Sequence, residues 1–89
     1  MNKEIIIKND NNEEKKFDIL FTFESEETNK KYVTYTDYSK DYKGKIRCWS
    51  SYFEGEELHP VKTENELRII DEMLRTLSRS TELKYSIEE

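Results

Sequence analysis

The single histidine and the single cysteine are the residues whose chemistry is most versatile. His59 would need a nucleophile or a carboxylate held beside it for general acid–base catalysis, yet it stands between a leucine and a proline near an acidic turn. Cys48 lies in an alternating apolar run, and free cysteines are among the most buried residue types. We therefore expect His59 to be a surface or edge-strand residue and Cys48 to be a core thiol, and we predict no catalytic residue and no enzyme.

Two clusters of glutamates could bring carboxylates together if their turns met at one end of the fold. Calcium needs about six to eight oxygen ligands around one point, and neither cluster has the alternating Asp/Asn and Gly pattern that supplies them. Paired carboxylates for glycoside hydrolysis need a cleft, which a very small domain rarely offers. We expect solvated turns, with no metal site and no cofactor. The residues are Glu24, Glu26, Glu27, Glu54, Glu56 and Glu57.

Aromatic residues are more numerous than one buried sheet face requires. Large rings occur at both parities of two predicted strands, whereas one helix can cover only one face. One interpretation is that these rings lie flat on a partly wet sheet with their polar ends in water. The other is a face for protein binding or self-association, because exposed apolar patches tend to mark contacts. The candidate interaction face consists of Tyr32, Tyr35, Trp49, Tyr52 and Phe53.

The charge balance bears on the class of partner. The net charge of −5 works against attraction to phosphate backbones and anionic lipid, which rests on lysine and arginine. Nucleic acid is therefore a disfavoured partner but not an excluded one. One cysteine cannot form an internal disulfide and fits a reducing compartment. The apolar run near the start is far shorter than a signal-peptide core or a membrane span, so we expect a cytoplasmic protein that does not enter a membrane.

Alternating residues predict the central strand. Phe17, Ile19, Phe21 and Phe23 recur at every second position, so they should share one buried face. Strong β-propensity and intervening turn residues predict further strands, whereas a charged, glycine-bearing stretch predicts a loop. The expected strands are about 3–8, 14–24, 31–36 and 46–53, with a loop over 37–45 and a short edge piece over 58–61.

A change of period then predicts one helix. Thr63 and Glu66 match a capping box, and an apolar stripe at helical spacing follows. A helix over 63–78 would be long enough to cover the phenylalanine face. We predict an α+β fold: an antiparallel β-meander of about four strands packed against one C-terminal α-helix. Residues 1–78 would form a single domain, and 79–89 a flexible tail unless Tyr85 or Ile87 docks.

The order of these motifs resembles a known family, the small bacterial domain of unknown function 1292 (DUF1292). The resemblance rests on the stretch from Phe17 to Glu24, the Lys-Tyr-Val strand at 31–33, and Leu-His-Pro-Val at 58–61 before an acidic capped helix. Asparagines replace the family's usual Asp-Gly turn here, and 37–45 is less acidic. The resemblance implies a soluble cytoplasmic protein, with no established activity and no catalytic residues to carry over. It also implies a gene neighbour resembling a Holliday-junction resolvase.

These observations favour a non-enzymatic protein-interaction or regulatory module, acting on an unknown protein partner or on a second copy. The alternative is an accessory protein associated with nucleic-acid processing, which the gene neighbourhood suggests. Its phosphate contacts would come from the basic residues Lys40, Lys43, Lys45 and Arg47.

Overall fold

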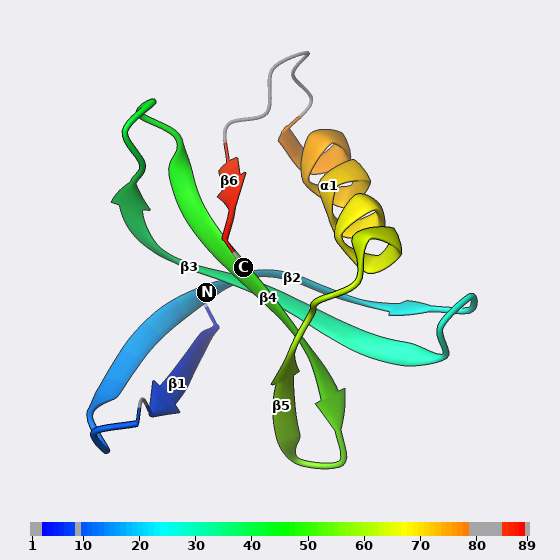
Figure 1. The fold of residues 1–89 in the computed structure, drawn as a ribbon, viewed down its shortest axis with the longest axis horizontal. Coiled ribbons are helices and arrows are strands. Elements are labelled where there is room, and N and C mark those ends of the chain that lie inside the picture. The colour runs from blue at the N-terminus through cyan, green and yellow to red at the C-terminus, as the bar shows by residue number, and fades with distance from the viewer. Residues whose placement is uncertain (1–2, 9, 79–84, 89) are drawn as a thin grey trace.

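The computed structural model describes residues 3–8, 10–78 and 85–88. Among them it has six strands and one helix (Figure 1). Strands β1 to β5 form an antiparallel meander in chain order, and β6 pairs with β4 in parallel. The elements are β1 (Glu4–Lys8), β2 (Glu14–Ser25), β3 (Lys30–Lys40), β4 (Ile46–Glu54), β5 (Glu57–Pro60), α1 (Glu64–Ser78) and β6 (Tyr85–Ile87).

The α+β class and the meander are confirmed, but the expectation of about four strands is too low. The piece predicted at 58–61 is a true strand, β5, which pairs with the second half of β4. Pro60 ends this strand on the sheet edge, where its missing N–H costs no ladder hydrogen bond. The first half of the same β4 edge is taken by β6.

The predicted loop over 37–45 is also partly wrong, because β3 continues to Lys40. The pairing of β3 with β4 is interrupted between Thr36 and Lys40 by a bulge, and Tyr38 there has a φ of 63°. The Asp37 carboxylate accepts hydrogen bonds from the backbone N–H and the hydroxyl of Ser39. Side-chain bonds of this kind replace ladder bonds that a bulge removes.

A second bulge divides the phenylalanine face. The register of β2 against β3 shifts between Ile19 and Phe21, and one extra residue turns the following side chains to the other side of the sheet. Phe21 and Phe23 pack against the core beneath the helix, together with Leu20. Phe17 instead contacts rings on the opposite face. The prediction that all four alternating residues share one face is therefore wrong.

Helix α1 begins as its capping box predicts. The Glu66 N–H donates to the Thr63 hydroxyl at 3.2 Å, and Ile70 and Leu74 are fully buried in the core. Leu77, three residues after Leu74 and so close to the same helix face, is 54% exposed. The helix lies on one side of the sheet, while the β1–β2 and β4–β5 hairpins extend away from it (Figure 1).

The last described residues pair with the sheet. Tyr85 and Ile87 lie opposite Ile46 and Cys48 and pack against the core. We expected a flexible tail over 79–89 unless Tyr85 or Ile87 docked, and both of these side chains do dock. Residues 79–84 and 89, on which the rest of that prediction falls, lie outside the described residues.

Candidate functional site

The five rings of the candidate interaction face are divided between the two sides of the sheet. Residues directly opposite each other in an antiparallel pair share a face. Tyr32 is paired with Tyr52, and Tyr35 with Trp49. Phe53, four residues after Trp49, shares its parity. The helix side thus bears Tyr32 and Tyr52, and the other side bears Tyr35, Trp49 and Phe53.

Tyr32 is a buried structural anchor and not a surface ring. Its side chain is 1% exposed. Its hydroxyl donates to Glu66 Oε2 at 2.5 Å and is hydrogen-bonded to Thr28 Oγ1 at 2.6 Å. Burial, and then the bond to Glu66, raise the pKa of Tyr32 to about 12. Tyr32 therefore joins the β2–β3 turn, β3 and the start of α1.

Glu66 has two roles in this network. Its other oxygen accepts a hydrogen bond from the Thr63 hydroxyl at 2.7 Å, and Lys30 Nζ lies 3.6 Å from Oε2. Burial alone would raise the pKa of Glu66, but the hydrogen bonds from Tyr32 and Thr63 and the Lys30 charge hold it below its usual range. A buried carboxylate that is ionised and fully partnered fixes the helix on the sheet. The capping pattern marked Glu66 in the sequence, but nothing there indicated its bond to Tyr32.

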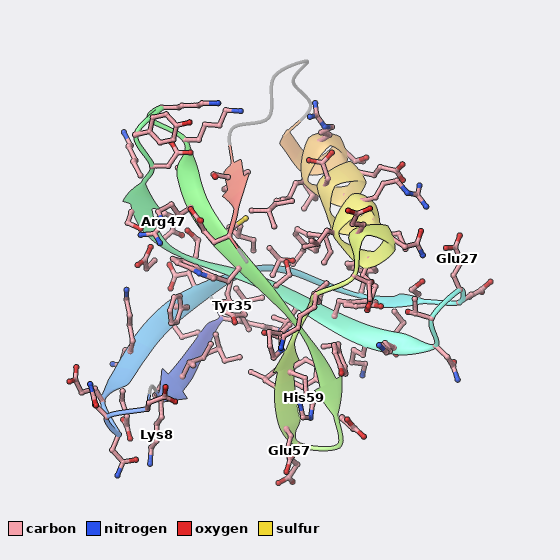
Figure 2. The ribbon with its side chains drawn as sticks, viewed as in Figure 1. Lys8, Glu27, Tyr35, Arg47, Glu57 and His59 are labelled. Carbon is pink, nitrogen blue, oxygen red and sulfur yellow. The ribbon has the colours of Figure 1, made fainter. Side chains whose placement is uncertain are left out.

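His59 lies beside two acids, at an exposed end of the fold. Its Nε2 atom is 3.3 Å from both Glu54 Oε2 and Glu57 Oε2, and its ring stacks on Tyr52 at 5.4 Å. Figure 2 shows His59 and Glu57 on the β4–β5 hairpin, away from the helix. Both glutamates are exposed. The described neighbours of His59 are two carboxylates and a tyrosine ring, and none of them is a serine or cysteine nucleophile that the imidazole could activate. The arrangement orients an edge-strand histidine, as we expected.

Cys48 is confirmed as a core thiol. It is fully buried in the core, beside Ile87 of β6, and burial, with a smaller effect of the Glu88 carboxylate, raises the pKa of its thiol to about 12. Because the thiolate is the reactive species, burial and the raised pKa both disfavour reaction of this thiol while it stays in the core. All six glutamates of the acidic clusters are exposed; three of them lie in turns, and Glu24, Glu54 and Glu57 lie at strand ends. No group of three or more His, Cys, Asp or Glu within the described chain is arranged to hold a metal ion.

The face that α1 does not cover carries a packed group of three rings: Phe17, Tyr35 and Trp49. We call it the aromatic face. The Phe17 ring meets Tyr35 at 5.1 Å and Trp49 at 5.4 Å, both edge to face. Tyr35 is buried and its hydroxyl is hydrogen-bonded to Ser51 Oγ at 2.9 Å. Phe17 and Trp49 are half-buried, so these two rings are held rigidly while part of their surface remains in water.

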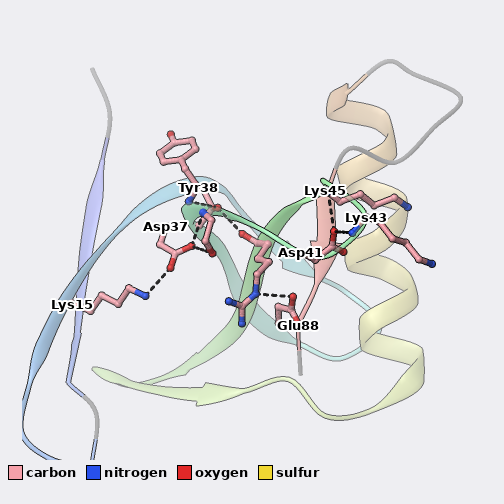
Figure 3. A network of polar contacts seen from close by, with 10 residues as sticks. Lys15, Asp37, Tyr38, Asp41, Lys43, Lys45 and Glu88 are labelled. Atoms are coloured by element: carbon pink, nitrogen blue, oxygen red, sulfur yellow. Dashed lines mark hydrogen bonds and ion pairs between the residues drawn. The ribbon is translucent and has the colours of Figure 1, made fainter.

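Cations border these rings, and each is paired with an acid. Arg47 Cζ lies 5.1 Å from the centre of the Trp49 ring, and its Nε donates to Glu88 Oε1 at 2.9 Å. At the other end, Lys15 Nζ lies 5.4 Å from the Phe17 ring and 2.7 Å from Asp37 Oδ2 (Figure 3). The aromatic face therefore has an apolar centre and a polar border with little net charge.

The loop between β3 and β4 carries two of the four basic residues of the nucleic-acid alternative, Lys43 and Lys45, whereas Lys40 ends β3 and Arg47 lies in β4. Asp41 organises it by accepting backbone hydrogen bonds from Lys43 and Lys45, both at 2.9 Å (Figure 3). Lys43 Nζ lies 5.5 Å from the ring of Tyr42, which is 92% exposed. The loop is thus an exposed, ordered turn with one prominent ring.

Two shallow grooves lie elsewhere on the described surface, and neither is lined by Phe17, Tyr35 or Trp49. One of about 480 Å³ is lined by residues near the β2–β3 turn and the end of β4, among them Tyr52, Phe53 and Lys31. The other, of about 320 Å³, lies between the β3–β4 loop, α1 and β6. Both are lined by mixed polar and apolar groups, without a reactive constellation.

Comparison with known proteins yields relatives in bacteria of the genera Bacillus and Listeria. A UPF0473 protein of Bacillus pumilus (strain SAFR-032) is 39% identical over 80 residues, which cover 83% of this chain and 84% of the relative. One from Listeria welshimeri is 40% identical over 78 residues, covering 81% and 78%. The UPF0473 protein YrzB of Bacillus subtilis (strain 168) is 35% identical over 80 residues, covering 83% and 86%.

The names of these relatives state no activity, ligand or partner. No family model matches the chain, and no solved structure matches it either. Among the described residues, no helix has the length and apolar character that crossing a bilayer requires. Identity at this level over most of both chains nevertheless establishes common descent, and the chain belongs to the UPF0473 family of bacterial proteins.

Proposed function

We propose that this protein is a non-enzymatic protein-binding module and that a partner docks on the aromatic face. One observation carries the proposal: Trp49 is half-buried, braced edge to face by Phe17, and flanked by Arg47. Tryptophan, tyrosine and arginine are the residues that dominate binding energy at protein interfaces. A ring held rigidly before binding loses little conformational entropy when a partner covers it.

The polar border supports a protein partner. Interfaces commonly have an apolar centre depleted of charge and a polar, solvated rim. Here the rim consists of the ion pairs Lys15–Asp37 and Arg47–Glu88. Of the five rings first considered, Trp49 and Phe53 are the ones that share this side and keep accessible surface, so the proposed contact centres on Trp49, Phe17 and Phe53.

A second candidate is the accessory role in nucleic-acid processing. Rings paired with cations on a sheet are the platform that single-strand binders use for stacking, and Arg47 over Trp49 with Lys15 over Phe17 has that form. Both cations are already neutralised by carboxylates, and the net charge is −5. Phosphate attraction is therefore weak, and protein binding is favoured.

Three related inferences accompany this proposal. We infer a cytoplasmic location, supported by the single, free and buried cysteine. We infer a relation to DUF1292 from the stretch Phe17 to Glu24, and this resemblance brings no activity and no site residues with it. We also propose that residues 1–78 form the folded unit and that 79–89 are an appended segment, of which β6 and Glu88 dock on that unit.

The experiment is a capture from a lysate of the organism that encodes the protein, comparing three baits. The wild-type chain and Tyr42→Ser, whose ring is exposed on another loop, should retain the same partner at equal levels. Trp49→Ser should lower affinity for that partner roughly 30-fold or more, because hot-spot residues contribute about 2 kcal/mol or more. Circular dichroism checks that each bait is folded.

Two outcomes would count against the proposal. Equal capture by Trp49→Ser and the wild type would show that the aromatic face is not the contact. A salt-sensitive shift of single-stranded DNA or RNA that depends on Arg47 and Lys15 would favour the second candidate instead.

A further inference from the structure

The C-terminal strand β6 occupies a position that resembles bound peptide more than an integral strand. It is three residues long, pairs in parallel with β4 only, and all three of its residues are half-buried. Parallel pairing is slightly less stable per residue than antiparallel pairing, and a three-residue segment makes few such bonds. Most of its attachment must therefore come from side chains.

Those side-chain contacts follow the pattern of strand addition, in which backbone bonds position a peptide and alternate side chains enter pockets. Tyr85 and Ile87 pack against the core, while Ser86 between them points the other way. The Glu88 N–H then donates to the Cys48 carbonyl at 2.8 Å, and its carboxylate accepts from Arg47 Nε at 2.9 Å. From residue 85 to residue 88 the segment is therefore apolar, polar, apolar and acidic in succession.

The edge of β4 that β6 covers is well defined. Ile46 to Cys48 form the pairing partner of β6, and the next part of the same edge is taken by β5. In Figure 1, β6 lies between β4 and α1. The groove of about 320 Å³ runs beside β6 and gives space for further residues of an extended chain. We call the β4 edge from Ile46 to Cys48, with the core surface that receives Tyr85 and Ile87, the β6 slot.

We propose that the β6 slot is a peptide-binding site, filled here by the chain's own C-terminal segment, and that it accepts an extended segment of a partner protein. The incoming segment would lie parallel to β4 and carry apolar, polar, apolar and acidic residues in succession. Exchange leaves the helix-to-sheet core in place, because the half-buried β6 side chains cover that core from outside. This site adjoins the contact centred on Trp49, with which it shares the Arg47–Glu88 ion pair, but the proposal does not depend on that contact.

Cys48 reports on occupancy, because it is fully buried in the core and its neighbour across the β4 edge is Ile87 of β6. The full-length chain with Ile87→Asp should place a charge against the core and release β6. Burying an aliphatic side chain of this size is worth enough to change opening about 10- to 100-fold, so Cys48 should react with a thiol reagent faster by that factor. Ile87→Val is the matched control at the same position, because it keeps a β-branched aliphatic side chain, and it should leave the rate near that of the wild type.

The decisive step is rescue in trans. A synthetic peptide of residues 84–89, added to the Ile87→Asp chain at up to millimolar concentration, should restore protection of Cys48, whereas the same peptide with Ile87→Asp should not. If Ile87→Asp fails to fold by circular dichroism, Glu88→Lys replaces it, since this change opposes Arg47 but keeps both apolar side chains.

Three results would overturn the proposal. A folded Ile87→Asp chain whose Cys48 stays as protected as in the wild type would show that β6 does not cover the slot. Fast reaction without any protection by the wild-type peptide would show that the slot takes no segment in trans. A dimeric mass with protected Cys48 would mean that a second copy fills the slot, and not a separate partner.

Discussion

Replacing Tyr32 by phenylalanine tests the network that fixes the helix on the sheet. The substitution removes one oxygen from a side chain that is 1% exposed and leaves the ring, which stacks on Phe23 at 5.1 Å. It deletes the hydrogen bonds to Glu66 and Thr28. Glu66 Oε2 would then keep only the Lys30 ammonium, at 3.6 Å.

The expected size of the effect follows from these two bonds. A hydrogen bond to a charged group contributes about 1.5–3 kcal/mol and a neutral one about 0.5–1.5 kcal/mol. Part of this loss is offset because the hydroxyl no longer has to leave water. We therefore expect Tyr32→Phe to lower the free energy of unfolding by roughly 2–4 kcal/mol.

The assay is urea unfolding followed by the fluorescence of Trp49, the only tryptophan, with Tyr42→Phe as the exposed control. The control should stay within about 0.5 kcal/mol of the wild type, and the slope of free energy against urea should not change. A double-mutant cycle of Tyr32→Phe with Glu66→Gln should give a coupling energy of about 1–3 kcal/mol. A loss below about 0.5 kcal/mol with no coupling would refute the assigned role of the network.

Three further predictions concern pH and backbone strain. Burial alone would raise the pKa of Asp37, but its bonds to Lys15 and a neighbouring serine hold that pKa well below the usual range. The stability of the fold should therefore be lost as the pH falls below about 4. Asp37→Asn should flatten this acid limb when the free energy of unfolding is plotted against pH. At the other extreme, Tyr32 and Cys48 have pKa values raised to about 12, so the stability they contribute is present below their unfolded pKa values and lost as the pH rises towards 12. Each group should give a slope of about 1.4 kcal/mol per pH unit between its unfolded and folded pKa, and an alkaline limb unchanged in Tyr32→Phe would contradict this. Tyr38 has a φ of 63° and is exposed, so Tyr38→Gly should raise the free energy of unfolding by up to about 1 kcal/mol, and a lower melting temperature would argue against strain there.

Local signals in the sequence predicted the parts of the fold that local physics determines. The capping box at Thr63 and Glu66 placed the start of α1, because its hydrogen bonds span only three residues. The apolar surroundings of Cys48 likewise predicted a buried thiol. These features depend on neighbours in the chain, so pattern and residue type suffice to find them.

The bulges could not be predicted in this way. The alternation from Phe17 to Phe23 is unbroken in the sequence, and no glycine or proline marks the shift after Ile19. The shift is visible only in the pairing with β3, where it divides the rings between two faces. A similar argument applies to β6, since three residues give no usable period and its parallel partner lies about forty residues earlier in the chain.

For the candidate interaction face, the sequence indicated rings on both sides of the sheet but not which rings share a side. An aromatic surplus beyond one face was read correctly, yet the rings that share the uncovered side include Phe17 and exclude Tyr32 and Tyr52. The polar border was invisible in the sequence, because Arg47 and Glu88 are far apart in the chain. Tertiary pairing decides which aromatic residues can meet a partner.

The most direct test of the proposed function is the accessibility of Trp49 when a captured partner binds. As the only tryptophan, it alone gives the indole fluorescence of the chain, and a tryptophan-free fragment or peptide of the partner keeps the signal unambiguous. The account predicts that binding shifts the emission to shorter wavelength and reduces quenching by acrylamide, because the partner covers the half-buried ring. Binding that leaves both the emission and the quenching of Trp49 unchanged would contradict the claim that the aromatic face is the contact.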